Sequence, residues 1–183
     1  MSTISQKAII WARGRLRQQV GAGECWDLAD QALRNAGGKS STTTDWDDDY
    51  VWGTAIELKD VVPGDVLQFR DYVVTTNTEV TTSFADGSET DETTEETVER
   101  PHHTAIVDGN PGAGWLSILE QNVAPLGKKV QKHKLATRTM DQPSKTVRKT
   151  VKNDAGKWLN ATIVTKVSIT VSGTIWAYRP QAK

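Results

Sequence analysis

The chain has 183 residues, a mass of 20.1 kDa and a formal net charge of −1 at pH 7. Its length suits one compact domain, and 25% charged with 37% hydrophobic residues are ordinary for a soluble globular protein. One cysteine excludes an internal disulfide framework and every zinc motif built on several cysteines. Three histidines do not favour a His-rich metal site, and the near-zero charge argues against a protein built mainly to hold nucleic acid.

The sequence contains no pattern typical of an export signal or a membrane span. The first 20 residues hold only one short apolar run, Ala8 to Ala12, whereas a secretory signal needs about 7–15 such residues. No stretch approaches the ~18 apolar residues of a spanning helix. We therefore expect no membrane contact and a chain that is cytoplasmic as synthesised, with release or delivery to a cell wall as an alternative.

Two helices are predicted first. Residues 5–20 carry apolar side chains at helical spacing, and Gly21-Ala22-Gly23 breaks this pattern. Residues 25–36 carry one apolar stripe, which Gly37-Gly38 ends. An irregular connection is expected over 39–60. It includes an acidic run, Asp45 to Asp49, which is typical of a solvated turn and lacks the glycine and closing glutamate of a calcium-binding loop.

Strands are predicted for the rest of the chain, over 66–74, 104–107, 115–122, 128–135, 161–171 and 174–179. Helices first and a mostly antiparallel sheet after them predict an α+β fold.

Charge is distributed unevenly along the chain. Residues 71–100 hold one basic and nine acidic side chains together with nine threonines, while residues 101–183 carry a net charge of +9. The alternation in 71–100 and the turn signal Ala85-Asp86-Gly87-Ser88 predict a solvated hairpin or mobile loop between core strands, with a lid over a nearby site as the alternative. The basic strands of 140–183 favour a solvated sheet face over a site for an anionic polymer.

Cys25 lies at the first turn of the second predicted helix, directly after the glycine-rich break. Unpaired backbone N–H groups and the helix dipole favour negative charge there, so the thiol pKa is expected to fall. Cys25 also belongs to the helix's apolar stripe, so a core role remains the alternative.

A base and an orienting group for such a thiol are found on two later strands. His103 opens a predicted buried strand, and the following strand ends in Glu120-Gln121-Asn122. Pairing these strands across a turn at 108–114 places residue 107 near 115 and residue 103 near 119. Glu120 and Asn122 then share one side of the sheet and arrive close to His103, where a carboxylate or amide can hold an imidazole.

These residues, taken in order, resemble the CHAP domains (cysteine, histidine-dependent amidohydrolases/peptidases), which belong to the papain-like clan with the NlpC-type cell-wall peptidases. The matching segments cover roughly residues 20–125: Gly23-Glu24-Cys25-Trp26-Asp27-Leu28-Ala29, Val62-Pro63-Gly64-Asp65-Val66-Leu67, His103-Thr104-Ala105-Ile106-Val107 and Ile118-Leu119-Glu120-Gln121-Asn122. The resemblance implies a single papain-like domain over 1–183, with N-terminal helices packed on the sheet. Its core is expected at about 5–135, with the acidic insert at 71–100 and the basic strands at 140–183.

The resemblance also assigns roles to individual residues. Cys25 matches the nucleophile and His103 the general base, and Glu120 and Asn122 match the polar residues that complete the site, whereas His102 matches no catalytic position.

Around these residues we expect further groups that bind the substrate or stabilise the oxyanion. The Cys25 backbone N–H is a candidate oxyanion donor, with Gln18 or Gln19 as a candidate second donor. The aromatic residues Trp26 and Trp52 are candidates for substrate binding. Trp46, Tyr50 and Trp52 could line a groove near the site, but packing in the core is the favoured interpretation for these three.

The function implied by the resemblance is a peptidoglycan amidase or endopeptidase without a cofactor or metal. A cysteine peptidase or deamidase acting on protein is one alternative, and a papain-like binding module without catalysis is another. We expect a monomer whose partner is a peptidoglycan or peptide substrate.

Overall fold

The computed structural model of the chain describes residues 3–43, 45 and 47–183. It divides into two compact units: unit 1 is Met1–Tyr72, Glu99–Thr137 and Gly173–Lys183, and unit 2 is Val73–Val98 with Arg138–Ser172. The sequence predicted one domain with an insert at 71–100; in the structure, most of that insert lies in unit 2 together with most of the basic C-terminal strands. Among the described residues, no helix is long and apolar enough to cross a membrane.

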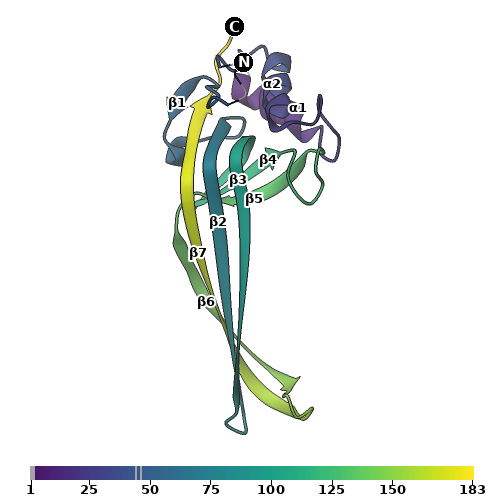
Figure 1. Cartoon of the computed structure of the whole chain (residues 1–183), viewed down its shortest axis with the longest axis vertical. Coiled ribbons are helices and arrows are strands. Elements are labelled where there is room, and N and C mark those ends of the chain that lie inside the picture. Colours follow the sequence, from purple (N-terminus) through teal and green to yellow (C-terminus); the bar gives the residue numbers. More distant parts are fainter. Residues whose placement is uncertain (1–2, 44, 46) are drawn as a thin grey trace. The chain divides into compact units, whose positions relative to one another are not determined.

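Two short helices precede a mostly antiparallel sheet, as the sequence predicted (Figure 1). The helices are α1 (Ile4–Arg13) and α2 (Cys25–Asn35), and a 3-10 helix follows at Leu58–Asp60. The strands are β1 (Thr54–Ile56), β2 (Val66–Phe84), β3 (Glu89–Gly112), β4 (Trp115–Glu120), β5 (Gln131–Ala136), β6 (Met140–Lys152) and β7 (Trp158–Arg179). The sheet order is β1-β7-β2-β3-β4-β5, and β6 pairs with β7.

Helix α1 is shorter than the predicted span of 5–20. It begins in a capping box, in which the Thr3 side chain accepts from the Gln6 N–H and the Gln6 side chain accepts from the Thr3 N–H. It ends at Gly14, which caps its C-terminus. The chain then leaves helical geometry, because the Arg17 N–H donates to the Val130 carbonyl at 2.8 Å.

Helix α2 matches its predicted span closely and is followed by Gly37 at a φ of 79°. Its buried face packs beside α1 (Figure 1), and the hydrophobic core of both helices includes Val66, Ile106 and Leu119 of the sheet. Cys25 is therefore the first residue of a helix that is anchored on the central strands.

The hairpin of β3 and β4 has a different register from the predicted one. Ile106 lies opposite Leu119 and Val107 opposite Ile118, because β3 continues to Gly112 and the turn needs only Ala113 and Gly114. The predicted turn over 108–114 was too long, so the predicted pairings of 107 with 115 and of 103 with 119 were both wrong. In the observed register Glu120 comes one residue after Leu119, level with the part of β3 that follows His103.

Strand prediction failed for the two long C-terminal strands. Strand β6 was missed because almost all its side chains are exposed, which leaves no alternation of apolar residues. Strand β7 is continuous where two strands were predicted. Gly173 does not form a turn; at a φ of 83° it passes so close to the Asp71 carbonyl that a Cβ would lie 2.1 Å from that oxygen.

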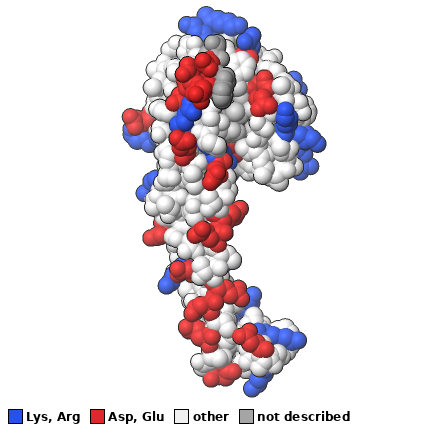
Figure 2. Space-filling model, viewed as in Figure 1, with Lys and Arg blue, Asp and Glu red and all other residues white. Residues whose placement is uncertain are grey.

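The acidic segment forms the predicted hairpin turn within unit 2. Phe84 and Ser88 close the turn by a backbone hydrogen bond of 2.8 Å, and Gly87 has a φ of 87°. Basic and acidic side chains are both present on the face of the molecule drawn in Figure 2.

The Pro63-Gly64-Asp65 turn fixes the start of β2 against α1 and β3. The Gly64 N–H donates to the Val107 carbonyl, and a Cβ at Gly64 would lie 1.8 Å from the Ser5 carbonyl oxygen. Asp65 is fully buried and accepts from Arg179 at 2.9 Å and from the Ser5 hydroxyl at 3.2 Å. This turn therefore ties the first helix, the sheet and the C-terminal strand together.

Candidate active site

The nucleophile candidate is held at the N-terminus of α2 by a closely packed glycine loop. Gly23 has a φ of 90°, and a Cβ there would lie 2.6 Å from the Lys128 side chain. The Asp27 carboxylate accepts from the Glu24 N–H at 3.1 Å, which closes the first turn of the helix. Cys25 is partly buried and follows directly.

Gln121 ties this loop to the end of β4. Its Nε2 donates to the Glu24 carbonyl at 2.6 Å and to the Val20 carbonyl at 2.9 Å, while its Oε1 accepts from the Val20 N–H. The side chain is fully buried. Because Glu120 is the preceding residue, Gln121 fixes the position of the Glu120 carboxylate relative to the cysteine loop.

His103 lies between Cys25 and Glu120. Its Nε2 bonds to the Glu120 Oε2 at 2.9 Å, which leaves Nδ1 as the ring nitrogen available to the Cys25 thiol in the same pocket. Burial disfavours the imidazolium, but the hydrogen bonds to Cys25 and Glu120 and the charges of both outweigh it and raise the pKa of His103 to about 9.

The pKa of the Cys25 thiol is shifted in the opposite direction, below its ordinary value. Burial raises the pKa of Cys25, but the hydrogen bond and charge of His103, with the backbone N–H groups of Thr104 and Trp26, bring it below its ordinary value. A thiol pKa that falls and an imidazole pKa that rises favour a thiolate–imidazolium pair near neutral pH.

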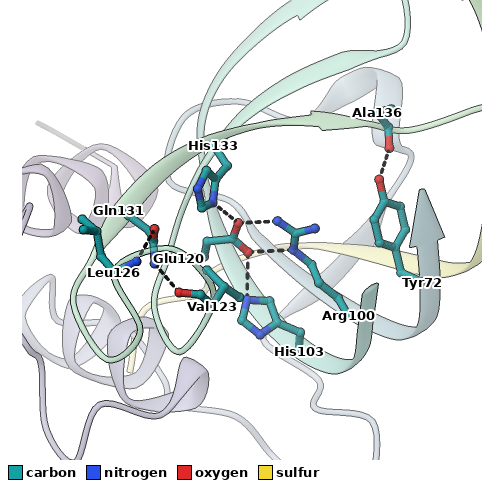
Figure 3. A network of polar contacts seen from close by, with 9 residues as sticks. All are labelled: Tyr72, Arg100, His103, Glu120, Val123, Leu126, Gln131, His133 and Ala136. Carbon is teal, nitrogen blue, oxygen red and sulfur yellow. Dashed lines mark hydrogen bonds and ion pairs between the residues drawn. The ribbon is translucent and has the colours of Figure 1, made fainter. Parts of the chain in front are cut away.

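Glu120 is the centre of a charged network (Figure 3). Its side chain is 0% exposed, and Arg100 Nε, His103 and His133 Nδ1 approach its oxygens at 2.8, 2.9 and 2.6 Å. Burial raises the pKa of Glu120, but these three partners hold it well below its usual range. The carboxylate is therefore ionised and faces His103.

A pocket of about 360 Å³ opens beside the thiol. Trp26, Tyr50 and His102 form part of its lining. Trp52 does not line it, because its ring is 1% exposed and lies behind, with centroids 6.1 Å from Trp26 and 6.0 Å from Tyr50. Trp46 is outside the described residues.

His102 and the acidic run support the wall of this pocket. His102 Nε2 donates to the Asp48 carbonyl at 2.9 Å, and its ring centroid is 5.1 Å from that of Tyr50. Arg70 Nε donates to the Asp49 carboxylate at 2.9 Å. The acidic run is thus paired with a basic residue and a histidine of the sheet.

Asn122 is placed differently from its neighbour Glu120. Strand β4 ends at Glu120, and Asn122 has a φ of 65°, so the alternation assumed for a strand does not extend to it. Its Nδ2 donates to the Glu24 carboxylate at 2.7 Å, and it lines the pocket. Gln18 and Gln19, the candidate oxyanion donors, are not among the residues that line the pocket.

Sequence reasoning missed Arg100, His133 and Gln121 as parts of the site. Gln121 is part of the segment that carries the resemblance and follows Glu120 directly, so its position in the sequence could have indicated a role at the site. Arg100 precedes His103 by three residues, and His133 is opposite Ile118 in the pairing of β4 and β5. No pairing of β4 with β5 was predicted and the predicted register of β3 with β4 was wrong, so the sequence did not bring these two residues to Glu120.

A family model described as "AIM3/BBC1 Cysteine proteinase-fold domain" matches residues 1–183. The chain is also 29% identical over 147 residues to "Altered inheritance of mitochondria protein 3" of Debaryomyces hansenii. That match covers 72% of this chain but only 14% of the relative, so the chain spans a small part of that protein's length. No solved structure matches the chain. The papain-like fold is thereby confirmed, while the finer CHAP assignment stays a prediction.

Proposed function

The chain belongs to the AIM3/BBC1 cysteine proteinase-fold domain family, and we propose that it is a cysteine-dependent amide hydrolase. The observation that carries this proposal is the placement of Cys25 and His103 at one pocket, with His103 bonded to the buried Glu120 carboxylate. A thiol nucleophile, a base and a group that orients the base are the three parts that such chemistry requires.

The Cys25 thiolate attacks the carbonyl carbon of the scissile amide, and the carbonyl oxygen takes the negative charge. The Cys25 backbone N–H, at the unpaired N-terminus of α2, is suited to donate to that oxygen. His103 then gives its proton to the leaving amine, and a thioester remains on Cys25. Water attacks the thioester with His103 as base, which releases the acid and restores the thiol.

Peptide or protein amides are the substrates that we propose. The aromatic lining formed by Trp26 and Tyr50 is suited to an extended chain, and the amide of Asn122 is suited to hydrogen-bond a substrate backbone at the pocket. Peptidoglycan, which the resemblance to CHAP domains implies, is also built with amide bonds, so it is tested beside protein substrates.

The first experiment asks whether Cys25 is an activated thiol. An electrophilic cysteine-hydrolase probe is applied at neutral pH, and its label is unambiguous because the chain has one cysteine. We expect labelling of the wild type, a strong loss in His103→Ala and none in Cys25→Ala. Labelling of His103→Ala at the wild-type rate would refute the assignment and favour a binding module without catalysis.

The second experiment asks what is cut. Peptide mixtures, a folded protein and purified peptidoglycan are incubated with the wild type and with Cys25→Ala, and the products are identified by mass spectrometry. New peptide termini that depend on Cys25 support a peptidase. Conversion of a side-chain amide to an acid, seen as a small mass gain without cleavage, supports a deamidase. Full activity in Cys25→Ala would overturn the mechanism.

A further inference from the structure

The buried carboxylate of Glu120 is fixed by more contacts than the orientation of one imidazole requires. Arg100 donates to both of its oxygens, His103 bonds to Oε2 and His133 bonds to Oε1. In Figure 3 these three side chains surround the carboxylate. Both oxygens are thus occupied, and the carboxylate can neither rotate nor exchange its partners without breaking a charged contact.

Arg100 supplies the compensating charge. Its residue is 5% exposed, and its guanidinium carbon lies 5.8 Å from the ring centroid of Tyr72, whose hydroxyl donates to the Ala136 carbonyl at 2.8 Å. The planar fork of an arginine sets the plane of a carboxylate, which a lysine does not. Arg100 therefore determines both the charge and the orientation of Glu120.

His133 fixes the second oxygen from the opposite strand. It stands on β5, its side chain is 28% exposed, and its Nδ1 faces Glu120. His133 does not line the pocket beside the thiol. Any effect of His133 on Cys25 must pass through Glu120 and His103.

We propose that Arg100 and His133 are positioning residues for the hydrolysis: they hold Glu120 charged and aligned so that it keeps His103 against Cys25. The inference rests on the proposed function, and neither residue touches the substrate. A stability role alone accounts poorly for the arrangement, because buried ion pairs contribute little net stability against apolar groups of similar volume.

The rate at which iodoacetamide alkylates Cys25 tests this inference without any substrate. It is measured on the full chain from about pH 5 to 10, where a thiolate–imidazolium pair gives a plateau between an acid and an alkaline limit. The titratable and charged groups near Glu120 are Arg100, His103, His133 and Tyr72, and Tyr50 and His102 line the pocket beside Cys25.

Arg100→Gln removes the compensating charge while keeping an amide donor. Glu120 then takes up a proton nearer neutral pH and His103 loses its charged partner, so the acid limit of the plateau moves to higher pH. Once the thiol pKa exceeds the assay pH, the alkylation rate falls by about tenfold for each further unit. The alkaline limit moves to lower pH. Arg100→Lys keeps the charge and is expected to retain both pH limits.

His133→Leu and His133→Asn form a second, matched pair. Leu removes the donor to Oε1 and is expected to lower the plateau rate about fivefold, the equivalent of one hydrogen bond. Asn places an amide N–H near the position of Nδ1 and is expected to stay within about twofold of the wild type.

The outcomes separate this inference from the proposed function. A wild type that alkylates like an ordinary thiol, without a neutral plateau, overturns the proposed function itself. A reactive wild type with folded Arg100→Gln and His133→Leu variants that keep its profile overturns only the positioning roles. If Arg100→Gln fails to fold, the His133 pair decides: equal rates in Leu and Asn overturn the proposal.

Discussion

Removing the charge of Glu120 alone should be far more damaging than removing it together with its partner. In Glu120→Gln the Arg100 guanidinium stays buried at 5% exposure without a carboxylate, and the new NH₂ group must face a donor from Arg100, His103 or His133. Breaking a buried ion pair from one side costs about 3–5 kcal/mol. Adding Arg100→Met removes the orphaned charge, so the double variant should regain most of that loss.

Urea unfolding at neutral pH, followed by far-UV circular dichroism, measures the wild type and both variants, and their midpoints give the differences in unfolding free energy. Glu96→Gln, an exposed change on the same strand as Arg100, is the control and should stay within about 0.5 kcal/mol. A loss below about 1 kcal/mol in Glu120→Gln, or a double variant less stable than the single one, would refute the reasoning.

Two further predictions concern the frame of unit 1, and thermal melts check both. Gly64→Ala should lower the unfolding free energy by more than about 3 kcal/mol or prevent folding, because its Cβ would lie 1.8 Å from the Ser5 carbonyl oxygen. In the control Gly37→Ala the new Cβ would meet nothing within 4 Å, so only the positive φ counts and the loss should be about 1 kcal/mol. Thr3→Ala removes the acceptor of the α1 capping box and should cost about 1 kcal/mol, whereas Thr3→Ser should be close to neutral.

The parts of the fold that the sequence predicted are those with strong local signals. Helix α2 has an apolar stripe, a glycine break before it and glycines after it, and its predicted and observed spans agree within one residue. Helix α1 was predicted too long because Leu16 and Val20 continue the helical spacing, although the chain there bonds to Val130 instead. Exposed β6 has no apolar alternation and could not be found by this criterion.

Residue type and order along the chain were enough to predict which residues meet at the centre of the candidate site. Cys25, His103 and Glu120 are brought together in the structure, and the motif order already placed them on a helix start and two neighbouring strands. Arg100 and His133 could not be predicted, because their meeting at Glu120 depends on a strand register and on a β4–β5 pairing that no local pattern encodes. Long-range register, more than residue identity, limits what one sequence shows about such a site.

For Asn122, the sequence resemblance and the structure predict different results of mutation. The resemblance groups it with Glu120, whereas in the structure its φ is 65° and its amide donates to the Glu24 carboxylate at 2.7 Å, at the edge of the pocket. Asn122→Gly removes the side chain and tolerates the positive φ, so it tests the side chain without adding backbone strain.

We expect Asn122→Gly to keep the wild-type pH limits of Cys25 alkylation and to raise KM in a peptide assay, because the amide would contact substrate and not the imidazole. Glu120→Gln is the matched opposite: it should move the alkaline limit below the His103 pKa of about 9, since the carboxylate that stabilises the imidazolium is gone. An equal shift of that limit in both variants would mean that Asn122 also orients His103, and that its bond to Glu24 is not maintained in solution.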